Sequence, residues 1–216
     1  MWLVTLNSEG DFEDIAARIP ADLGVRAYRI EASPAGARCA IPPEDLALPV
    51  FVHLADAGSA ADAFLDWGVR HLRLQALISS GTGLPCGTEW APSDLVVPPV
   101  CYRSVGRIEI NSPPILYEEI KLDRDLQSRL AGVLLPGRSI ADLGIWSARK
   151  PLTSSETRDW LATRISCQIA DTQTADLAIS AKQRGLRVGC AKAIASPDSK
   201  SALADAWVRV ARALHG

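Results

Sequence analysis

Polar residues that could bind a small ligand gather at three places, each beside a predicted strand. The segment Ser79-Ser-Gly-Thr-Gly83 follows an apolar stretch, Asp171-Thr-Gln-Thr174 opens a helical pattern, and Ser196-Pro-Asp198 follows a second apolar stretch. Ligand sites in α/β proteins usually lie at strand ends. These three segments are therefore the first candidates for a functional site.

The first segment has the flexibility of an anion-binding turn. Gly81 and Gly83 would let backbone N–H groups approach an anion or a sugar. The segment is neither a Walker loop nor a complete Gly-x-Gly-x-x-Gly motif. A tight turn at the exit of a strand remains an alternative explanation.

The other two segments also have structural explanations. Asp171 or Thr172 could cap a helix while Gln173 faces solvent. Ser196 could belong to an ordinary Ser-Pro turn, with Asp198 as the cap of the last helix. Taken singly, none of the three segments establishes a chemistry.

Alternating apolar and helical patterns must position these segments. Strands are predicted at Trp2–Leu6 and at residues 25–31, 50–54, 72–79, 95–97, 100–110, 139–146 and 188–194. Helices are predicted at residues 9–18, 59–68, 122–134, 156–163, 171–184 and 200–214, with Ser59 as one expected N-cap. This alternation predicts an α/β fold, and the length favours one domain over residues 1–216.

Composition narrows the class of protein. The 48% of hydrophobic residues can bury a large core, and the net charge of −2 argues against a nucleic-acid surface. Five dispersed cysteines predict reduced, buried thiols and no metal site. The sequence contains neither a signal-peptide pattern nor an apolar run of about 18 residues that could span a membrane. We therefore expect a cytoplasmic protein without a membrane partner.

In order and spacing, the three segments resemble the nucleoside phosphorylase/nucleosidase superfamily, the purine and uridine phosphorylase type that includes methylthioadenosine nucleosidases and hopanoid-associated phosphorylases. Ala170-Asp-Thr-Gln-Thr-Ala175 is similar to the family's Val-Asp-Met-Glu-Ser-Ala, and Lys192-Ala-Ile-Ala-Ser196 to its Arg-Ala-Ile-Ser-Asp. Residues 78–82 with Ser93-Asp-Leu-Val-Val97 resemble its Gly-rich turn and a later strand, and Gly144-Ile-Trp-Ser147 with Leu152 its base-pocket strand and loop. The resemblance covers about residues 70–200.

The resemblance implies a three-layer α/β/α fold with a central mixed, partly barrel-like β-sheet. It further implies a homo-oligomeric protein that cleaves the N-glycosidic bond of a nucleoside-like substrate, with inorganic phosphate as a possible co-substrate and no other cofactor. The implied substrate-binding residues are Ser80, Gly81, Thr82 and Gly83 for phosphate or sugar, Thr172 and Gln173 for the ribose, and Trp146 and Leu152 for the base. Trp146 could instead belong to the core.

Two departures from the family's pattern bear on catalysis. Gln173 stands where the family has a Glu that holds both ribose hydroxyls, and an amide lacks the carboxylate's charge. Ser196 stands where the family has an Asp that protonates the departing purine, so we expect Asp198 to supply this acid if its loop bends inward. The alternative is a catalytically degenerate family member that binds a nucleoside-like ligand or a protein partner.

Two further positions leave a question for the structure. Asn7 follows the first predicted strand, at a position where the family commonly has a Gly that allows phosphate to approach. Lys192 is expected to point either toward the pocket or toward a carboxylate.

Overall fold

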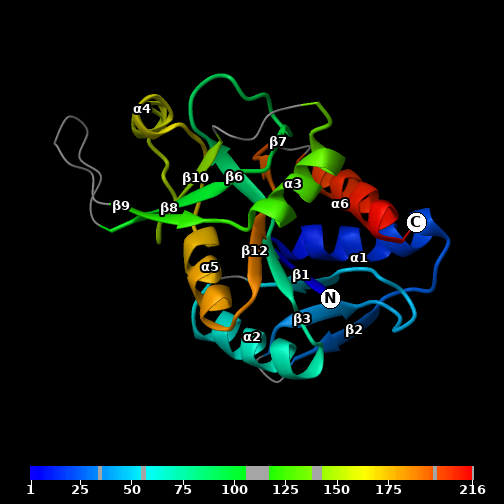
Figure 1. Cartoon of the computed structure of the whole chain (residues 1–216). Helices are drawn as coiled ribbons and strands as arrows, with labels where there is room; N and C mark the ends of the chain where they lie inside the picture. The colour runs from blue at the N-terminus through cyan, green and yellow to red at the C-terminus, as the bar shows by residue number, and fades with distance from the viewer. Residues whose placement is uncertain (34–35, 55–56, 106–116, 138–142, 197–198, 216) are drawn as a thin grey trace.

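The protein is built from two mixed β-sheets with helices on both sides (Figure 1). The computed structural model describes residues 1–33, 36–54, 57–105, 117–137, 143–196 and 199–215. The predicted strand residues 106–110 and 139–142, and the candidate acid Asp198, lie outside these ranges.

The first sheet is mostly parallel. Its strand order is β12 (Arg187–Cys190), β5 (Ala76–Ser79), β1 (Trp2–Leu6), β4 (Val50–His53), β3 (Arg38–Ile41) and β2 (Arg29–Ala32). The first four strands run parallel, and β3 and β2 add an antiparallel edge. Parallel strands of this kind are buried on both faces, which explains why β5 has four buried residues in succession.

The second sheet continues from the first. Its order is β7 (Leu95–Val96), β13 (Lys192–Ile194), β6 (Thr82–Pro85), β11 (Cys167–Asp171), β10 (Gly144–Ser147), β8 (Val100–Ser104) and β9 (Tyr117–Lys121). Short connections carry the chain from β5 into β6 and from β12 into β13. The two sheets therefore meet where these two strand pairs cross from one sheet into the other.

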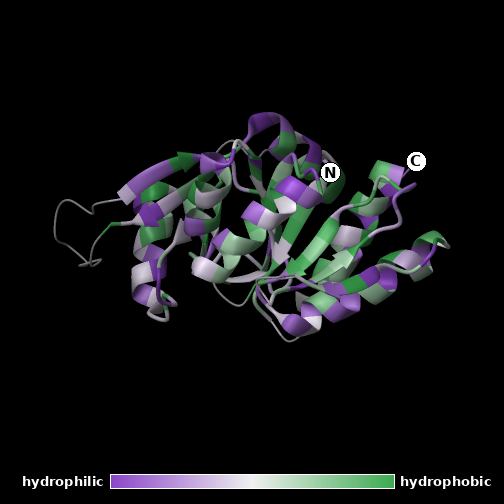
Figure 2. Cartoon of the chain, turned by 90° about the horizontal axis from the view of Figure 1, so that it is seen from below, coloured by the Kyte–Doolittle hydropathy of each residue, from purple (hydrophilic) through white to green (hydrophobic). Residues whose placement is uncertain are grey.

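Side chains that alternate along β1 divide the core into two layers. Val4 and Leu6 pack with α1 (Glu9–Leu23), α3 (Arg124–Leu134) and α6 (Ser199–His215). Leu3 packs in the other layer with α2 (Ser59–His71) and α5 (Thr174–Gln183). Successive strand residues point to opposite faces, so one strand serves both layers. Figure 2 shows the apolar strands between these helices.

Three helix starts have a side-chain N-cap, whereas α2 and α5 begin without one. Ser8 and Asp123 each accept a hydrogen bond from a backbone N–H in the first turn of α1 and α3, and Ser154 does so for α4 (Ser155–Ile165). The prediction of Ser59 as an N-cap is wrong, because Gly58 occupies that position without a side-chain bond and Ser59 is the first helical residue.

Two predicted elements differ from the structure near the candidate site. The strand predicted at residues 188–194 is divided between β12 and β13, because the chain passes from one sheet to the other at Ala191. The helix predicted from Asp171 begins at Thr174, because Asp171 is the last residue of β11. The α/β fold class itself is confirmed.

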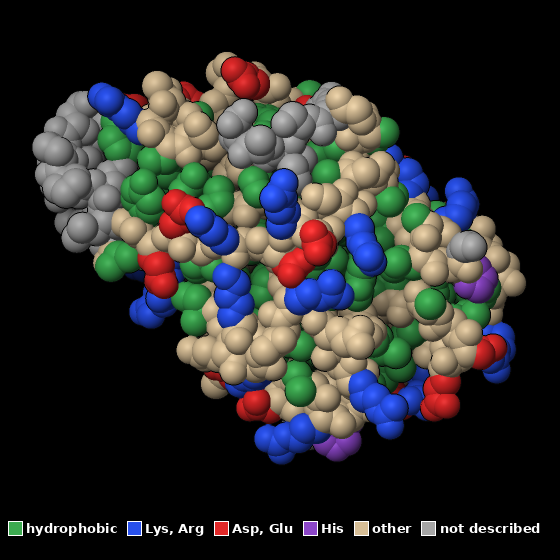
Figure 3. All heavy atoms as spheres, viewed as in Figure 1, with side chains coloured by type: hydrophobic (Ala, Val, Ile, Leu, Met, Phe, Trp, Pro, Cys, Tyr) green, Lys and Arg blue, Asp and Glu red, His purple; other side chains and the backbone are tan. Residues whose placement is uncertain are grey.

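Within the described ranges, no helix combines the length and apolar character needed to cross a bilayer. On the face in Figure 3, Lys and Arg side chains are interspersed with Asp and Glu.

Candidate active site

A buried ion pair occupies the ends of the strands that carry the predicted site. The Lys192 Nζ atom lies 3.0 Å from Asp171 Oδ2, and both side chains are excluded from solvent. Lys192 also donates a hydrogen bond of 2.8 Å to the Ser80 carbonyl. The Thr174 hydroxyl donates to Asp171 over 2.6 Å. Lys192 thus points toward a carboxylate. Its contacts connect β13 to the turn at Ser80 and to the end of β11 at Asp171.

The charges of this pair are stabilised together. Burial alone would raise the pKa of Asp171, but the positive charge of Lys192 and hydrogen bonds from Thr174, Lys192 and Ser147 hold that pKa below its ordinary value of 3.8. With its oxygens engaged in this way, the Asp171 carboxylate has a structural role.

The Gly-rich turn is closed by a side chain of the protein itself. Asn7 Nδ2 donates to the Thr82 carbonyl over 3.1 Å, and Asn7 Oδ1 accepts from the Thr82 N–H over 3.3 Å. Gly81 has a φ of +110°, and a Cβ there would collide with the Asn7 amide. The Thr82 backbone N–H lies in the turn expected to approach an anion, and it already donates a hydrogen bond to Asn7.

Gln173 is a buried residue that holds two elements together. It is 5% exposed, and its Nε2 donates over 3.1 Å to the carbonyl of Leu54, the residue that follows β4. Its backbone N–H donates to Asp171. This arrangement turns at least one amide donor away from any ribose.

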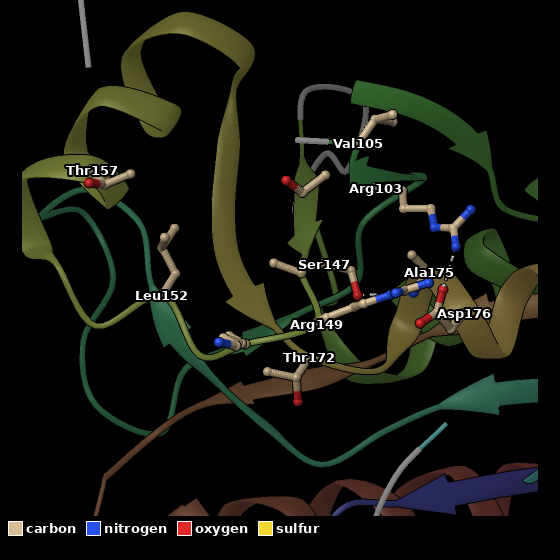
Figure 4. Close-up of a pocket in the computed structure, with 12 residues that line it drawn as sticks. Arg103, Val105, Ser147, Arg149, Leu152, Thr157, Thr172, Ala175 and Asp176 are labelled. Atoms are coloured by element: carbon tan, nitrogen blue, oxygen red, sulfur yellow. Dashed lines mark hydrogen bonds and ion pairs between the residues drawn. The ribbon is translucent and has the colours of Figure 1, made fainter. Parts of the chain in front are cut away.

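A cavity of about 630 Å³ lies at the carboxyl ends of β8, β10 and β11, beside the start of α5 (Figure 4). These three strands are parallel, so their carboxyl ends share one edge of the sheet. The lining residues come from the strand ends and the loops that follow: Arg103, Ser104, Val105, Ser147, Ala148, Arg149, Lys150, Leu152, Thr157, Thr172, Ala175 and Asp176. A second cavity of about 470 Å³ shares Arg149, Thr172 and Asp176 with it.

The polar lining includes four charged side chains, those of Arg103, Arg149, Lys150 and Asp176. Arg103 forms ion pairs with Asp176 at 3.0 Å and with Glu118 at 3.5 Å. Arg149 and Lys150 are exposed and form no ion pair or hydrogen bond with another described residue. Ser147 is buried at the cavity edge and accepts the Ala175 N–H over 3.0 Å.

The structure divides the predicted site residues into two groups. Leu152 and Thr172 line the larger cavity. Ser80, Gly81, Thr82, Gly83, Trp146 and Gln173 do not line it.

Several of these residues have other roles in the structure. Trp146 is fully buried in a small core cluster, and the Ser80 hydroxyl accepts the Trp207 indole N–H. Gly83 lies against Ile169, where a Cβ would collide. The Ser196 hydroxyl is 2.8 Å from that of Ser93.

Sequence reasoning missed the charged residues of the cavity. Arg149 and Lys150 lie shortly after the strand predicted at residues 139–146, so the strand-end rule could have found them. Arg103 and Asp176 lie within a predicted strand (residues 100–110) and a predicted helix (residues 171–184), so the strand-end rule did not select them. Among the described residues, no group of three or more His, Cys, Asp or Glu side chains could hold a metal ion.

The chain is similar to known proteins in its fold and not detectably in its sequence. No family model matches the sequence, and no curated protein matches it. Among solved structures, a putative methylthioadenosine nucleosidase from Weissella paramesenteroides superposes with a TM-score of 0.75 at 14% identity, covering 100% of this chain and 99% of that one. Futalosine hydrolase of Helicobacter pylori gives 0.72 at 12% identity, covering 98% and 96%. The 5'-methylthioadenosine/S-adenosyl homocysteine nucleosidase of Campylobacter jejuni gives 0.70 at 11% identity, covering 98% and 95%.

These likenesses extend over nearly the whole chain, although few residues are identical. The chain therefore has the nucleoside phosphorylase/nucleosidase fold that the resemblance implied.

Proposed function

We propose that the protein hydrolyses the N-glycosidic bond of a nucleoside-like substrate held in the 630 Å³ cavity. The observation that carries this proposal is the position of the cavity at the carboxyl ends of three parallel strands, in a fold shared with nucleosidases and futalosine hydrolase.

The lining suits a ligand with one apolar and one polar part. Its volume lies within the range of about 300–1,000 Å³ that is typical of small-molecule sites. Leu152 offers apolar contact for a base, and Thr172 offers a hydroxyl for a sugar. Both belonged to the predicted substrate-binding set.

Water is the proposed acceptor in place of phosphate. The Thr82 N–H that would have approached a phosphate is bonded to Asn7, and Asn7 also bonds the Thr82 carbonyl. In hydrolysis, the bond between the sugar carbon and the base nitrogen breaks, and a water oxygen forms the new bond to that carbon.

Asp176 is the proposed carboxylate for this reaction. Glycoside cleavage develops positive charge on the sugar, and a carboxylate in the cavity can stabilise this charge or accept a proton from water. Its partner Arg103 holds it at 3.0 Å along one wall. A proton for the departing base is assigned to Asp198, as the sequence suggested, and a cytoplasmic homo-oligomer remains part of the same proposal.

The second candidate is a protein that binds a nucleoside-like ligand without turnover. Gln173 donates to Leu54 and the Ser196 hydroxyl lies against Ser93, so two positions that the family uses for ribose and base are engaged elsewhere. These contacts favour a protein that has lost the family's catalytic mechanism but keeps a cavity for a ligand.

A nucleoside panel assayed for free base, with and without phosphate, separates these candidates. Hydrolysis predicts base release that does not require phosphate and that falls at least about 100-fold in Asp176→Asn, the scale of acid–base catalysis. Asp125→Asn, an exposed residue in the first turn of α3, is the matched control and should retain activity.

The other outcomes are equally informative. Thermal stabilisation by one nucleoside without any base release selects the binding function. Neither release nor stabilisation across the panel contradicts both. Strict dependence on phosphate would overturn the choice of water.

A further inference from the structure

We propose that the natural ligand of this cavity is a nucleoside-like molecule that carries an anionic group, held by Arg149 and Lys150. This inference rests on the proposed function and adds a substrate class to it. The anionic group is a phosphate or a carboxylate, since both present oxygens to a guanidinium or ammonium group.

The first observation is the charge of the lining. Three cationic side chains, Arg103, Arg149 and Lys150, face one carboxylate, Asp176, among the residues that line the larger cavity. Like charges repel one another, so this excess is costly unless a counter-charge is present. For a chain with a net charge of −2, a local positive excess at a cavity is a deviation from the average surface.

The second observation is how these cations are paired. Arg103 is engaged by Asp176 and Glu118, which leaves its charge balanced within the protein. Arg149 and Lys150 have no such partner among the described residues, whereas Arg18, Arg38 and Arg184 each contact a carboxylate. Their donors are therefore available to a ligand.

The third observation is where Arg149 lies. It lines both cavities, together with Thr172 and Asp176. In Figure 4 its side chain extends across the cavity from the loop after β10. The second cavity also contains Asp62, but that carboxylate is held by Arg184 and the Ser180 hydroxyl. Arg149 can thus reach a ligand that occupies either cavity or spans both.

The three observations together favour an anion over a neutral ligand. A neutral nucleoside would offer these two exposed cations no opposite charge, whereas an anion would form charge-assisted hydrogen bonds with both. A guanidinium can bind two oxygens at once, which suits phosphate and carboxylate alike.

Equilibrium binding by calorimetry at low and high salt tests the inference with matched probes: adenosine and adenosine 5'-monophosphate, inosine and inosine 5'-monophosphate, adenosine 5'-carboxylate, and inorganic phosphate alone. We expect at least one anionic probe to bind about 10-fold or more tightly than its neutral parent at low salt. The preference should shrink as salt screens the charges. Phosphate and carboxylate probes show which anion is preferred.

Three variants assign the preference to residues. Arg149→Gln and the double variant Arg149→Gln/Lys150→Gln should reduce the ratio of anionic to neutral affinity by about 5-fold or more. Arg209→Gln, an exposed arginine on α6 away from the cavity, should leave that ratio unchanged. Both cavity residues are exposed, so thermal melting should remain near that of the wild type.

The outcomes distinguish failure of this inference from failure of the proposed function. Equal binding of anionic and neutral probes, or a preference that survives in the double variant, overturns this inference and leaves the proposed function standing. Arg149-dependent binding of inorganic phosphate without any nucleoside binding keeps the anion site but refutes the nucleoside function. Absence of binding by every probe refutes both.

Discussion

The ammonium group of Lys192 contacts the carboxylate of Asp171 at 3.0 Å inside the protein, with the two side chains 0% and 2% exposed. Lys192 begins β13 and Asp171 ends β11, on either side of β6 in the second sheet. The hydrogen bond from Lys192 to the Ser80 carbonyl also ties the turn between β5 and β6 to this ion pair. One buried cation thus fixes the place where the two sheets meet, beside the candidate cavity.

Removing this cation should destabilise the fold strongly. Lys192→Met keeps the apolar stem but leaves the Asp171 charge buried without its partner, which typically costs about 3–5 kcal/mol. Urea unfolding followed by fluorescence measures this loss. Lys121→Met, an exposed lysine on β9, is the control and should change stability by less than about 0.5 kcal/mol. Equal effects of the two substitutions would refute the role of the pair.

The same variant should reverse the pH dependence of stability. The pKa of Asp171 lies below 3.8 in the folded protein, so its stabilising contribution is complete above that value and is lost as the pH falls through the folded pKa. In Lys192→Met, burial raises the pKa of Asp171. Protonation of Asp171 at falling pH then removes the unpaired buried charge, and the variant regains part of the lost stability. The stability deficit of the variant should be largest near neutral pH and narrow toward pH 4, and a constant deficit would contradict this account.

Asn7 and Gly81 should show coupled effects on stability. Gly81→Ala forces a side chain into a φ of +110° and displaces the Asn7 amide, whereas in an Asn7→Ala background only the backbone strain remains. A double-mutant cycle from urea unfolding should give a coupling of about 1 kcal/mol or more. Additive effects would show that the turn does not depend on Asn7. Gly132→Ala, in the open interior of α3, is the control and should stabilise slightly.

Restoring the family's acidic residue at position 173 should destabilise this chain. Gln173→Glu replaces the Nε2 donor with an oxygen that faces the Leu54 carbonyl, which leaves a buried acceptor unpaired at a cost of about 1–3 kcal/mol. Gln183→Glu, an exposed position on the same helix, is the matched control. Thermal melting measures both. Tighter nucleoside binding by Gln173→Glu without loss of stability would restore the predicted ribose role.

The thiols should be unreactive while the protein is folded. All five cysteines are buried and free, and burial raises the pKa of Cys39 to about 11 and of Cys190 to about 12. Burial also raises the pKa of the Cys101 and Cys167 thiols. Reaction with Ellman's reagent at pH 8 should be at least about 100-fold slower than in urea, because the thiolate is the reactive form. Rapid labelling of any thiol in the folded state would contradict this.

The local rules of sequence reading worked where neighbours along the chain decide the structure. The apolar run Trp2–Leu6 predicted β1 correctly, and the starts of α1 and α3 were predicted within a few residues. The odd, dispersed cysteines were correctly expected to be buried and free. The resemblance carried by residues 170–175 and 192–196 led to the right fold, because the order of polar segments at strand ends survives when few residues are identical.

The site was decided by contacts between residues far apart in sequence. Asn7 forms hydrogen bonds with Thr82, and Gln173 forms one with Leu54. Two predicted ligand-binding segments are therefore bonded to residues distant in sequence, which no local sequence pattern could predict. The cavity instead gathers Arg103, Arg149 and Asp176, which lie on separate elements that only the sheet order brings together. The sequence alone determined the class of fold, through periodicity and strand-end motifs. Only the tertiary structure decided which polar groups remain free for a ligand, because a hydrogen bond to a distant partner is set by packing in three dimensions.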